Sequence, residues 1–435
     1  MGDTLVIFMT LLAGLFFLLL SGMWIAVALA LIGFLGLTFA VGGGMQGMLE
    51  VLQLRVVNSF VLCSIPLFIL LGNLMLHSGL MESVYRGINP FLSRLPGGLL
   101  HTNIGACGIF GSCSGSSIAA AATIGQFAMP VMRELGYNRQ LIYGSLAGGG
   151  TLSSMIPPSI CFILYGAWVG ESVGALFIAG IIPGILLALF LMTYIAGISL
   201  LKPGLQPQHE KIPIRENLKA LVRIIPVLFI IFAVLGTIYL GIATPTEAAA
   251  LGVSAALIIC VVSRKLTWEI LKDSLLSTVK TTTMVFFILV GAMAFSMVIS
   301  MLKIPEVLSL WVVSLELGKW TVFVAIVCIY IVLGAIIDPT SMMLMTLSVT
   351  YPLMMKMGFN SIWFGVCMAV FVEMAVITPP LGLNLFVIHS ISGEKDIAVV
   401  TRGSMPYFVC MIVLLALLYF FPQIALWLPH QFLGQ

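Results

Sequence analysis

Two stretches of the sequence interrupt long apolar segments with a double proline: Gly148-Gly-Gly-Thr-Leu-Ser-Ser-Met-Ile-Pro-Pro-Ser159 and Glu373-Met-Ala-Val-Ile-Thr-Pro-Pro-Leu-Gly-Leu-Asn384. Adding 222 to the numbers of the first proline pair gives the second pair, an interval of about half of the 435-residue chain. Four further matches share this interval: Pro130 with Pro352, Met132 with Met354, Gly136 with Gly358, and Asn138 with Asn360. A two-fold internal repeat in an apolar chain is typical of secondary transporters.

The composition is that of a membrane protein. Hydrophobic residues make up 61% of the chain and charged residues 8%, with a mean hydropathy of +1.18, whereas soluble domains average about 25% charged residues. The eight cysteines form no CxxC pair and are interpreted as small core residues. No Walker A motif and no catalytic or metal-binding constellation is present. We therefore expect neither ATP as energy source, nor an enzyme, nor an organic cofactor, nor a nucleic-acid partner.

Apolar runs of spanning length recur along the chain. Ten spanning helices are predicted near 4–20, 22–41, 59–80, 136–168, 172–200, 224–242, 246–263, 281–302, 359–391 and 404–428. Two further apolar segments, about 97–130 and 319–352, break at Gly111–Ser117 and at Gly334–Thr340. Their arms of about 13–18 residues are short for a span, so both segments are interpreted as re-entrant hairpins.

Charge predicts the topology. Fifteen of the nineteen Lys and Arg residues fall on one side of this arrangement, and Arg55, Lys303, Lys319 and Lys356 fall on the other. The positive-inside rule makes the first side cytoplasmic, which leaves both termini on the external side of an inner-membrane-type protein. An odd number of spans in each half inverts the second half. The sequence thus predicts an all-α polytopic membrane protein of two inverted repeats, 1–220 and 221–435, each with about five spans and one re-entrant hairpin.

Two hydrophilic stretches, Lys202–Arg223 and Arg264–Lys280, are predicted on the cytoplasmic side. Each is interpreted as containing an amphipathic helix in the membrane plane. Such helices could brace a moving domain or simply anchor the protein at the interface.

A backbone break at membrane depth leaves polar groups that only protein, water or a ligand can pair. Ser116 and Asp338, which are related by the same interval, are predicted to cap the second arms of the two hairpins, and Pro339 suits the first helical position. Two helix N-termini near the membrane centre favour an anion. The candidate substrate-binding residues are Ser114, Ser116, Ser117, Pro157, Asp338, Thr340, Pro379 and Asn384.

The double prolines free upstream carbonyl oxygens, which broken-helix transporters use to hold Na⁺. One Na⁺ site is predicted in each half, between hairpin tip and helix break. The candidate ligands are Ser112, Gly115, Gly150, Thr151, Ser153, Gly334, Asp338, Glu373, Thr378 and Gly382. The alternative interpretation of such glycine and serine runs is close helix packing.

Three carboxylates lie in or beside apolar sequence, where ionisable groups mark functional sites by default. Glu247 fits a capping box with Thr244. Asp338 could cap its helix or shape the site. Glu373 could bind a cation or titrate, although its counterpart in the first half is Thr151. No predicted core span carries a central Arg or Lys, so anion binding would rest on helix N-termini, Na⁺ and hydroxyls.

Together these segments resemble the large membrane subunit of TRAP transporters, of the DctM or SiaM type. Residues 111–125 look like the first hairpin of that family, and Gly149–Ser159 looks like its first broken helix. Its later motifs are similar to Thr244-Pro-Thr-Glu-Ala-Ala-Ala250, Asp338-Pro339-Thr340 and Ile377–Asn384. The resemblance covers essentially the whole chain. Glu373 departs from it, because the family often has a neutral residue there.

The resemblance implies the ion transporter superfamily fold and an elevator mechanism, in which a transport domain holding both hairpins slides along a fixed scaffold domain. It also implies Na⁺-driven uptake of a small organic anion, a small four-helix membrane subunit and a periplasmic substrate-binding protein. One alternative is a self-sufficient Na⁺/carboxylate symporter of the same superfamily, and another is a passive channel or membrane scaffold. The cargo stays open among C4-dicarboxylates, sialic acid, other sugar acids and sulfonates.

Overall fold

The protein is helical throughout the part that the computed structural model describes, residues 2–41, 54, 56–205, 207 and 214–433. The helices of residues 2–205 are α1 (Gly2–Leu20), α2 (Ile25–Gly36), η1 (Leu37–Val41), η2 (Val61–Cys63), α4 (Ser64–His77), α5 (Leu80–Leu92), α6 (Leu99–Ser114), α7 (Ser117–Glu134), α8 (Arg139–Gly150), η3 (Thr151–Ser154), α9 (Ile160–Val169), α10 (Val173–Leu201) and η4 (Pro203–Leu205). Those of residues 214–433 are α11 (Ile214–Tyr239), α12 (Pro245–Val262), α13 (Trp268–Met301), α14 (Ile304–Ser314), α15 (Lys319–Gly334), α16 (Pro339–Lys356), α17 (Ser361–Ile377), α18 (Leu383–Ser392), α19 (Ile397–Phe420) and α20 (Gln423–Leu433).

Five described helices are long and apolar enough to cross a membrane unbroken: Val173–Leu201, Val222–Tyr239, Pro245–Val262, Trp268–Met301 and Ile397–Phe420. A sixth candidate is the pair Val61–His77 and Leu80–Leu92, which bends by 72°. The other predicted spans contain shorter apolar helices, including the two interrupted by double prolines. The chain is therefore a multi-pass helical protein.

The interval of 222 reappears in the helix boundaries. Adding 222 to the first and last positions of α7 gives those of α16, and adding it to the first position of α8 gives that of α17. The turns before α8 and α17 match as well, because Gly136 and Gly358 are left-handed (φ 83° and 77°). Asn138 and Asn360 then cap the helices that follow. The inversion of one half relative to the other in a membrane stays a prediction.

Helices of the first half pack against helices of the second half. Helix α2 contacts α13, α4 contacts α12, α8 contacts α19, and α10 contacts α17. Each of these pairs joins one helix of residues 1–220 to one of residues 221–435. The predicted repeats are thus units of sequence that interlock in space.

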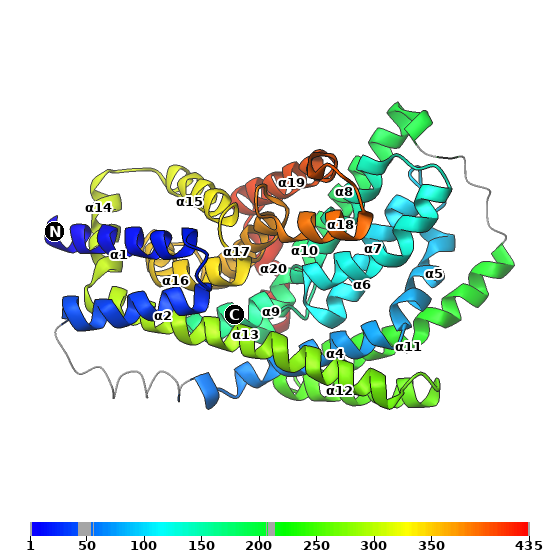
Figure 1. The fold of residues 1–435 in the computed structure, drawn as a ribbon, viewed down its shortest axis with the longest axis horizontal. Coiled ribbons are helices and arrows are strands. Elements are labelled where there is room, and N and C mark those ends of the chain that lie inside the picture. Colours follow the sequence, from blue (N-terminus) through cyan, green and yellow to red (C-terminus); the bar gives the residue numbers. More distant parts are fainter. Residues whose placement is uncertain (1, 42–53, 55, 206, 208–213, 434–435) are drawn as a thin grey trace.

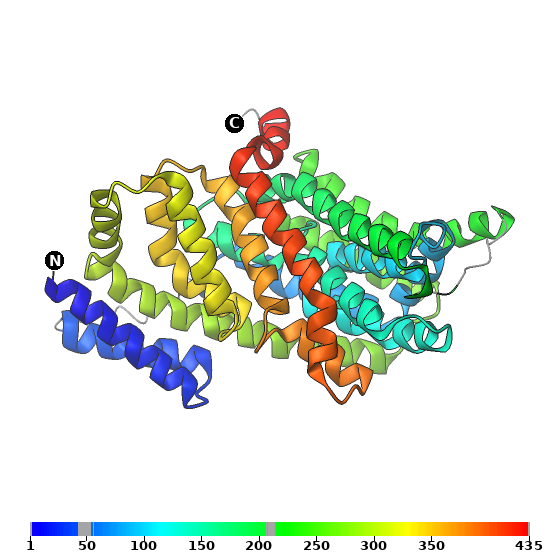
Figure 2. The same ribbon diagram turned by 90° about the horizontal axis from the view of Figure 1, so that it is seen from above.

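Figure 1 shows α2, α13, α4 and α12 along one side of the molecule, with both hairpins and the broken helices on the other side. Helices α1 and α14 lie together at one end, and α5 and α11 at the opposite end. Seen from above, α13 runs from the α1–α2 end toward the middle (Figure 2). Close contact with α2 depends on Gly291, where an added Cβ would lie 2.5 Å from the Ala26 carbonyl oxygen.

Both predicted in-plane helices are wrong as separate elements. Residues 268–280 continue without a break into the predicted span 281–302 and form the 34-residue α13. Residues 214–223 likewise continue into α11. Polar residues at the start of each helix suggested a boundary, but no proline or glycine interrupts α13 there to end the hydrogen-bonded ladder. Residues 206 and 208–213 of the first stretch lie outside the described part of the chain.

Two helices, α5 and α14, lie where the sequence analysis predicted connections. Helix α5 buries Leu80, Met81, Val84 and Ile88 on one side. Its opposite side carries the exposed ion pair between Arg86 and Glu82. With 13 residues, this helix is too short to cross a membrane by itself.

Candidate functional site

Both hairpins turn at the predicted positions. Helix α6 ends at Ser114, Gly115 takes a left-handed conformation (φ 59°), and the Ser116 hydroxyl accepts from the Ala119 N–H at 3.3 Å to cap α7. Asp338 Oδ2 accepts from the Ser341 N–H at 3.0 Å and caps α16, which begins at Pro339. Both predicted helix starts are therefore confirmed.

The two hairpin tips line one cavity of about 1010 Å³. Six predicted site residues take part in its wall: Gly115, Ser116, Ser117, Asp338, Thr340 and Glu373. The rest of the wall comes mainly from the α1–α2 turn, the middle of α13, and α9. A cavity of this size is large enough for a small organic ligand.

Glu373 lies at the inner wall of this cavity and is fully buried. Its Oε1 accepts from the Ser117 hydroxyl at 2.5 Å, and Ser117 in turn lies 3.3 Å from the Ser154 hydroxyl. Its Oε2 has no hydrogen-bond partner, and no ion pair within the described residues reaches the carboxylate. Burying an unpaired charge is costly, so this group needs either a proton or a bound cation.

Asn384 gives a second buried oxygen without a partner. Its Nδ2 donates to the Ala147 carbonyl at 3.2 Å, while Oδ1 is left unpaired. Gly150 lies between Asn384 and the first hairpin, since a Cβ there would be 2.9 Å from the Ser117 carbonyl oxygen and 3.0 Å from Asn384 Nδ2. Unpaired carboxylate and amide oxygens around a broken helix suit a cation such as Na⁺.

Three predicted hydroxyl ligands donate to carbonyls of their own segments: Ser112 to Ile109, Thr151 to Gly148 and Thr378 to Met374, at 2.6–2.7 Å. Two other predicted ligands, Ser153 and Gly334, lie where a hairpin arm closely approaches a broken helix. An added Cβ on Gly111 would lie 2.3 Å from Ser153 Cα, and one on Gly334 would lie 2.6 Å from Ala375 Cβ.

Eleven predicted site residues are outside the cavity wall: Ser112, Ser114, Gly150, Thr151, Ser153, Pro157, Gly334, Thr378, Pro379, Gly382 and Asn384. Of these, Ser114 accepts from the Ser116 N–H at 3.3 Å, and Gly382 precedes α18 as its N-cap. Pro157 is buried, whereas Pro379 is exposed. The wall therefore contains both hairpin tips and, from the two broken helices, Ser154 and Glu373, while the double prolines lie outside it.

The sequence analysis missed Ser154 and Lys280, both of which line the cavity. Ser154 was quoted within the first break, but only the turn η3 decides which serine faces Ser117. Lys280 was counted among the cytoplasmic loop charges. Lys280 lies directly before the predicted span 281–302, so the prediction about central positions of the spans did not cover it, and α13 carries it into the cavity wall.

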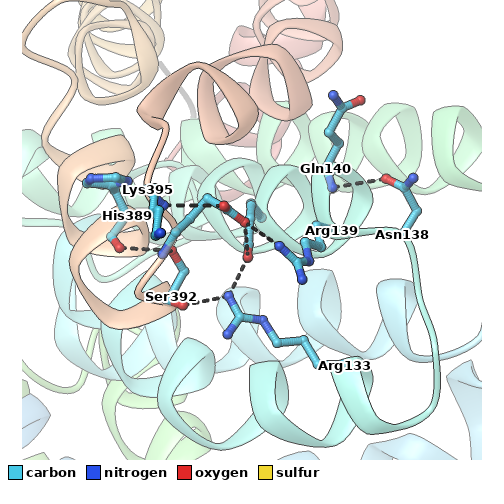
Figure 3. Close-up of polar contacts among 9 residues, drawn as sticks. Arg133, Asn138, Arg139, Gln140, His389, Ser392 and Lys395 are labelled. Carbon is cyan, nitrogen blue, oxygen red and sulfur yellow. Dashed lines mark hydrogen bonds and ion pairs between the residues drawn. The ribbon is translucent and has the colours of Figure 1, made fainter.

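A polar cluster joins the two halves at one end of the site region. We call Arg133, Arg139, Tyr143, Ser392 and Glu394 the polar clamp. Arg133 Nη2 donates to the Tyr143 hydroxyl and to the Ser392 carbonyl (2.6 Å), and Glu394 Oε2 accepts from Arg139 (3.2 Å) and Tyr143 (3.2 Å). Figure 3 shows both arginines reaching from α7 and α8 toward the segment after α18.

Glu394 is held as an anion by this clamp. Partial burial raises its pKa, but hydrogen bonds from the Tyr143 hydroxyl, the Lys395 N–H and Arg139 outweigh it and hold the pKa below its ordinary value.

Glu247 lies away from this site and has a local role. The Thr244 N–H donates to its Oε2 at 2.8 Å, and the Glu247 N–H donates to the Thr244 hydroxyl at 3.4 Å. The predicted capping box is confirmed.

The family model of the tripartite ATP-independent periplasmic transporter DctM component matches residues 12–424. The chain belongs to this DctM family. It is 33% identical to the C4-dicarboxylate TRAP transporter large permease protein DctM of Pseudomonas aeruginosa, over 85% of this chain and 86% of that protein. It is 30% identical to the sialic acid large permease SiaM of Vibrio cholerae, over 87% and 88% of the two chains. The 2,3-diketo-L-gulonate large permease YiaN of Escherichia coli is 32% identical, over 87% and 88%.

Two solved structures share the fold of this DctM family chain. The YdaH transporter of Alcanivorax borkumensis aligns with a TM-score of 0.55 at 14% identity, over 88% of each chain. MtrF of Neisseria gonorrhoeae aligns with a TM-score of 0.51 at 12% identity, over 86% of this chain and 84% of that one. At this identity the likeness concerns the fold alone. The predicted resemblance to the large TRAP membrane subunit is confirmed by the family match.

Proposed function

We propose that this chain is the large membrane subunit of a Na⁺-driven TRAP transporter that imports a small organic anion. A periplasmic binding protein delivers the anion, and a small four-helix membrane subunit completes the complex in the bacterial inner membrane. The observation that carries the proposal is the cavity shared by the two hairpin tips, with the caps Ser116 and Asp338 in its wall.

The charges of the cavity wall explain why the anion would need a co-transported cation. The wall contains one lysine, Lys280, and two carboxylates, Asp338 and Glu373. With all three ionised the wall carries one net negative charge and opposes an entering anion. Each bound Na⁺ adds one positive charge, so occupation of one cation site neutralises the wall and a second site makes it attractive.

The residues present fit Na⁺ at the inner wall. Glu373 Oε2 in the wall and Asn384 Oδ1 outside it are two of the buried oxygens without a hydrogen-bond partner. Ser117 donates to Glu373, and Gly150 lies next to Asn384. The cation would supply charge neutralisation there. Ser117 would orient the carboxylate, and the tight contact at Gly150 would exclude water from the space behind it.

Uptake would proceed by an elevator movement, with both hairpins and both broken helices travelling as one transport domain. The polar clamp supports a single moving unit, because it joins α7 and α8 to the segment after α18. The hydrogen bond between Ser117 and Glu373 joins the first hairpin to α17 in the same way. The predicted topology, with both termini periplasmic, would make the cavity wall at the α1–α2 turn its cytoplasmic side.

The test is transport by reconstituted protein. The chain, its small membrane subunit and the cognate binding protein are combined in proteoliposomes with labelled succinate, N-acetylneuraminate or 2,3-diketo-L-gulonate. We expect uptake of one of these anions only when an inward Na⁺ gradient and the binding protein are both present.

The other outcomes favour the alternatives. Uptake by this chain alone would identify a self-sufficient symporter, and uptake without any Na⁺ gradient would identify a passive channel. Failure to transport any of the three anions under every condition would refute a C4-dicarboxylate or sugar-acid cargo.

A further inference from the structure

Lys280 lies on a part of α13 that is fastened to its neighbour α4. Asn73 Nδ2 donates to the Thr278 hydroxyl at 3.0 Å, and the Ser277 hydroxyl donates to Asn73 Oδ1 at 3.2 Å. One turn earlier, His77 Nδ1 and the Ser274 hydroxyl are 3.1 Å apart. The backbone that carries Lys280 is thus hydrogen-bonded to α4 through side chains of neither hairpin.

From this position Lys280 lines the cavity together with its neighbours on α13, Thr281 and Thr283. The two ion pairs found among the described residues are Arg86–Glu82 and Arg139–Glu394, so neither wall carboxylate pairs with Lys280. The lysine is exposed, and its flexible stem lets the ammonium reach into the open space of the cavity. It is the one cationic side chain in the described wall.

We propose that Lys280 is an anion-binding residue of the cavity, pairing its ammonium with the carboxylate of the cargo while the hairpin tips lie beside α13. This inference rests on the proposed function and deepens it. The caps of α7 and α16 supply hydrogen-bonding groups and partial charge from the hairpins, and Lys280 supplies a full charge from the opposite wall. An anion held in this way bridges the two walls.

The lysine makes the affinity depend on the transporter's position. Helix α13 stays with α4, whereas the hairpin tips travel in the elevator movement. The Lys280 ammonium can therefore pair with the cargo carboxylate only when the tips lie beside Lys280. The counterpart of Lys280 in the first half is Asn58, which is neutral and outside this wall. By the predicted topology Lys280 lies on the cytoplasmic side. The positive charge therefore strengthens anion binding in the inward-facing state, whereas its counterpart Asn58 adds no charge on the periplasmic side.

The experiment compares three variants of the reconstituted complex. Lys280→Gln removes the charge, and Lys280→Arg restores it. Lys272→Gln removes a lysine that is also exposed, lies two turns earlier on α13 and is outside the cavity wall. Counterflow in inside-out vesicles presents the anion carried by the wild type, out of the three tested above, to the cytoplasmic face. Uptake with binding protein in right-side-out vesicles reports on the periplasmic face.

For Lys280→Gln we expect the cytoplasmic KM to rise about tenfold, as for loss of one charge-assisted contact, with the periplasmic KM changed less than about twofold. Lys280→Arg and Lys272→Gln should keep both values near wild type. Equal cytoplasmic KM in Lys280→Gln and wild type would overturn the inference, as would an equal rise on both faces or in the Lys272 control. A wild type that carries none of the three anions refutes a C4-dicarboxylate or sugar-acid cargo and not the role of Lys280, which separates the two failures.

Discussion

The two double-proline breaks occupy equivalent places in the two halves, and each lies beside the hairpin of its own half. They differ in their surroundings. In the first break Pro157, Pro158 and Ser159 are buried. In the second break Pro379, Pro380 and Leu381 are exposed, with Leu381 at 45%. Backbone polar groups at a break must be satisfied by protein or by water. The first break is therefore closed by protein, while the second must face a water-filled space or another subunit.

The two breaks also differ in the side chains at equivalent positions. Glu373 in the second half bonds to Ser117 of the first hairpin. The positions equivalent to this pair hold Thr151 and Pro339. Proline has no side-chain donor, and the Thr151 hydroxyl donates to Gly148 in its own helix. Of these two positions, 222 residues apart, one holds a buried acid hydrogen-bonded across the halves, and the other makes a local helix contact.

The largest expected effect comes from removing this acid. Glu373→Gln should lower Na⁺-driven uptake about 100-fold, because it removes the negative charge for which a buried cation is the compensating partner. Thr151→Val at the equivalent position should lower uptake about threefold or less. Initial uptake rates over a range of Na⁺ concentrations, corrected for the amount of protein, check both values. Equal losses in the two variants would show that the two breaks are functionally symmetric.

The next effect concerns the contact between each hairpin arm and its break. Gly111→Ala should destabilise the protein by about 3 kcal/mol, because the added methyl meets the backbone at Ser153. Gly334→Ala meets first the methyl of Ala375, so adding Ala375→Gly should recover part of its loss.

Thermal unfolding in detergent measures these changes in stability. As the control, Ser153→Gly is combined with Gly111→Ala in the same way as Ala375→Gly is combined with Gly334→Ala. No recovery is expected there, because the clash is with Cα. Recovery in the Gly111 pair and none in the Gly334 pair would contradict the stated geometry.

A third, smaller effect tests the difference in exposure directly. In a background without the exposed Cys63 and Cys328, Leu381→Cys should react with a water-soluble maleimide at least about tenfold faster than Ser159→Cys. Ser159 is 1% exposed, and cysteine preserves its size. Labelling of membrane vesicles followed by gel shift gives the two rates. Comparable rates would mean that the first break is as open as the second.

The smallest effect is expected at the polar clamp, which holds α18 of the second break near the first half. Arg139→Ala should lower the midpoint of thermal unfolding only slightly and less at high salt, because the Arg139 side chain is 68% exposed. The folded-state pKa of Glu394 lies below its ordinary value. Its contribution is therefore present above the unfolded pKa of about 4.3 and is lost as the pH falls through the folded pKa.

Melting curves of the wild type and of Glu394→Gln should accordingly differ at pH 7 and converge in acid. A difference that persists unchanged at pH 3 would separate the clamp from the ionisation of Glu394.

Much of the local structure was predictable because local chemistry decides it. Serine and aspartate caps, Pro339 at a first helical position and glycine at the turns fixed where the hairpin arms begin. The capping box at Glu247 needed only four consecutive residues. The prediction of separate in-plane helices was wrong because it relied on polarity and not on a residue that ends a helix. Polarity suggested a boundary at Lys280, but no residue there breaks a helix, so α13 continued.

The sequence by itself determined the membrane class, the hairpins, the double-proline breaks, the interval between the two halves and the family. Tertiary structure alone decided which of these elements meet. Ser117 and Glu373 are 256 residues apart, and Asn384 reaches Ala147 across 237 residues. Lys280 faces the hairpin tips only because α13 packs on α2, α4 and α16. Helix ends follow from neighbouring residues, whereas contacts between distant helices depend on how the two halves interlock.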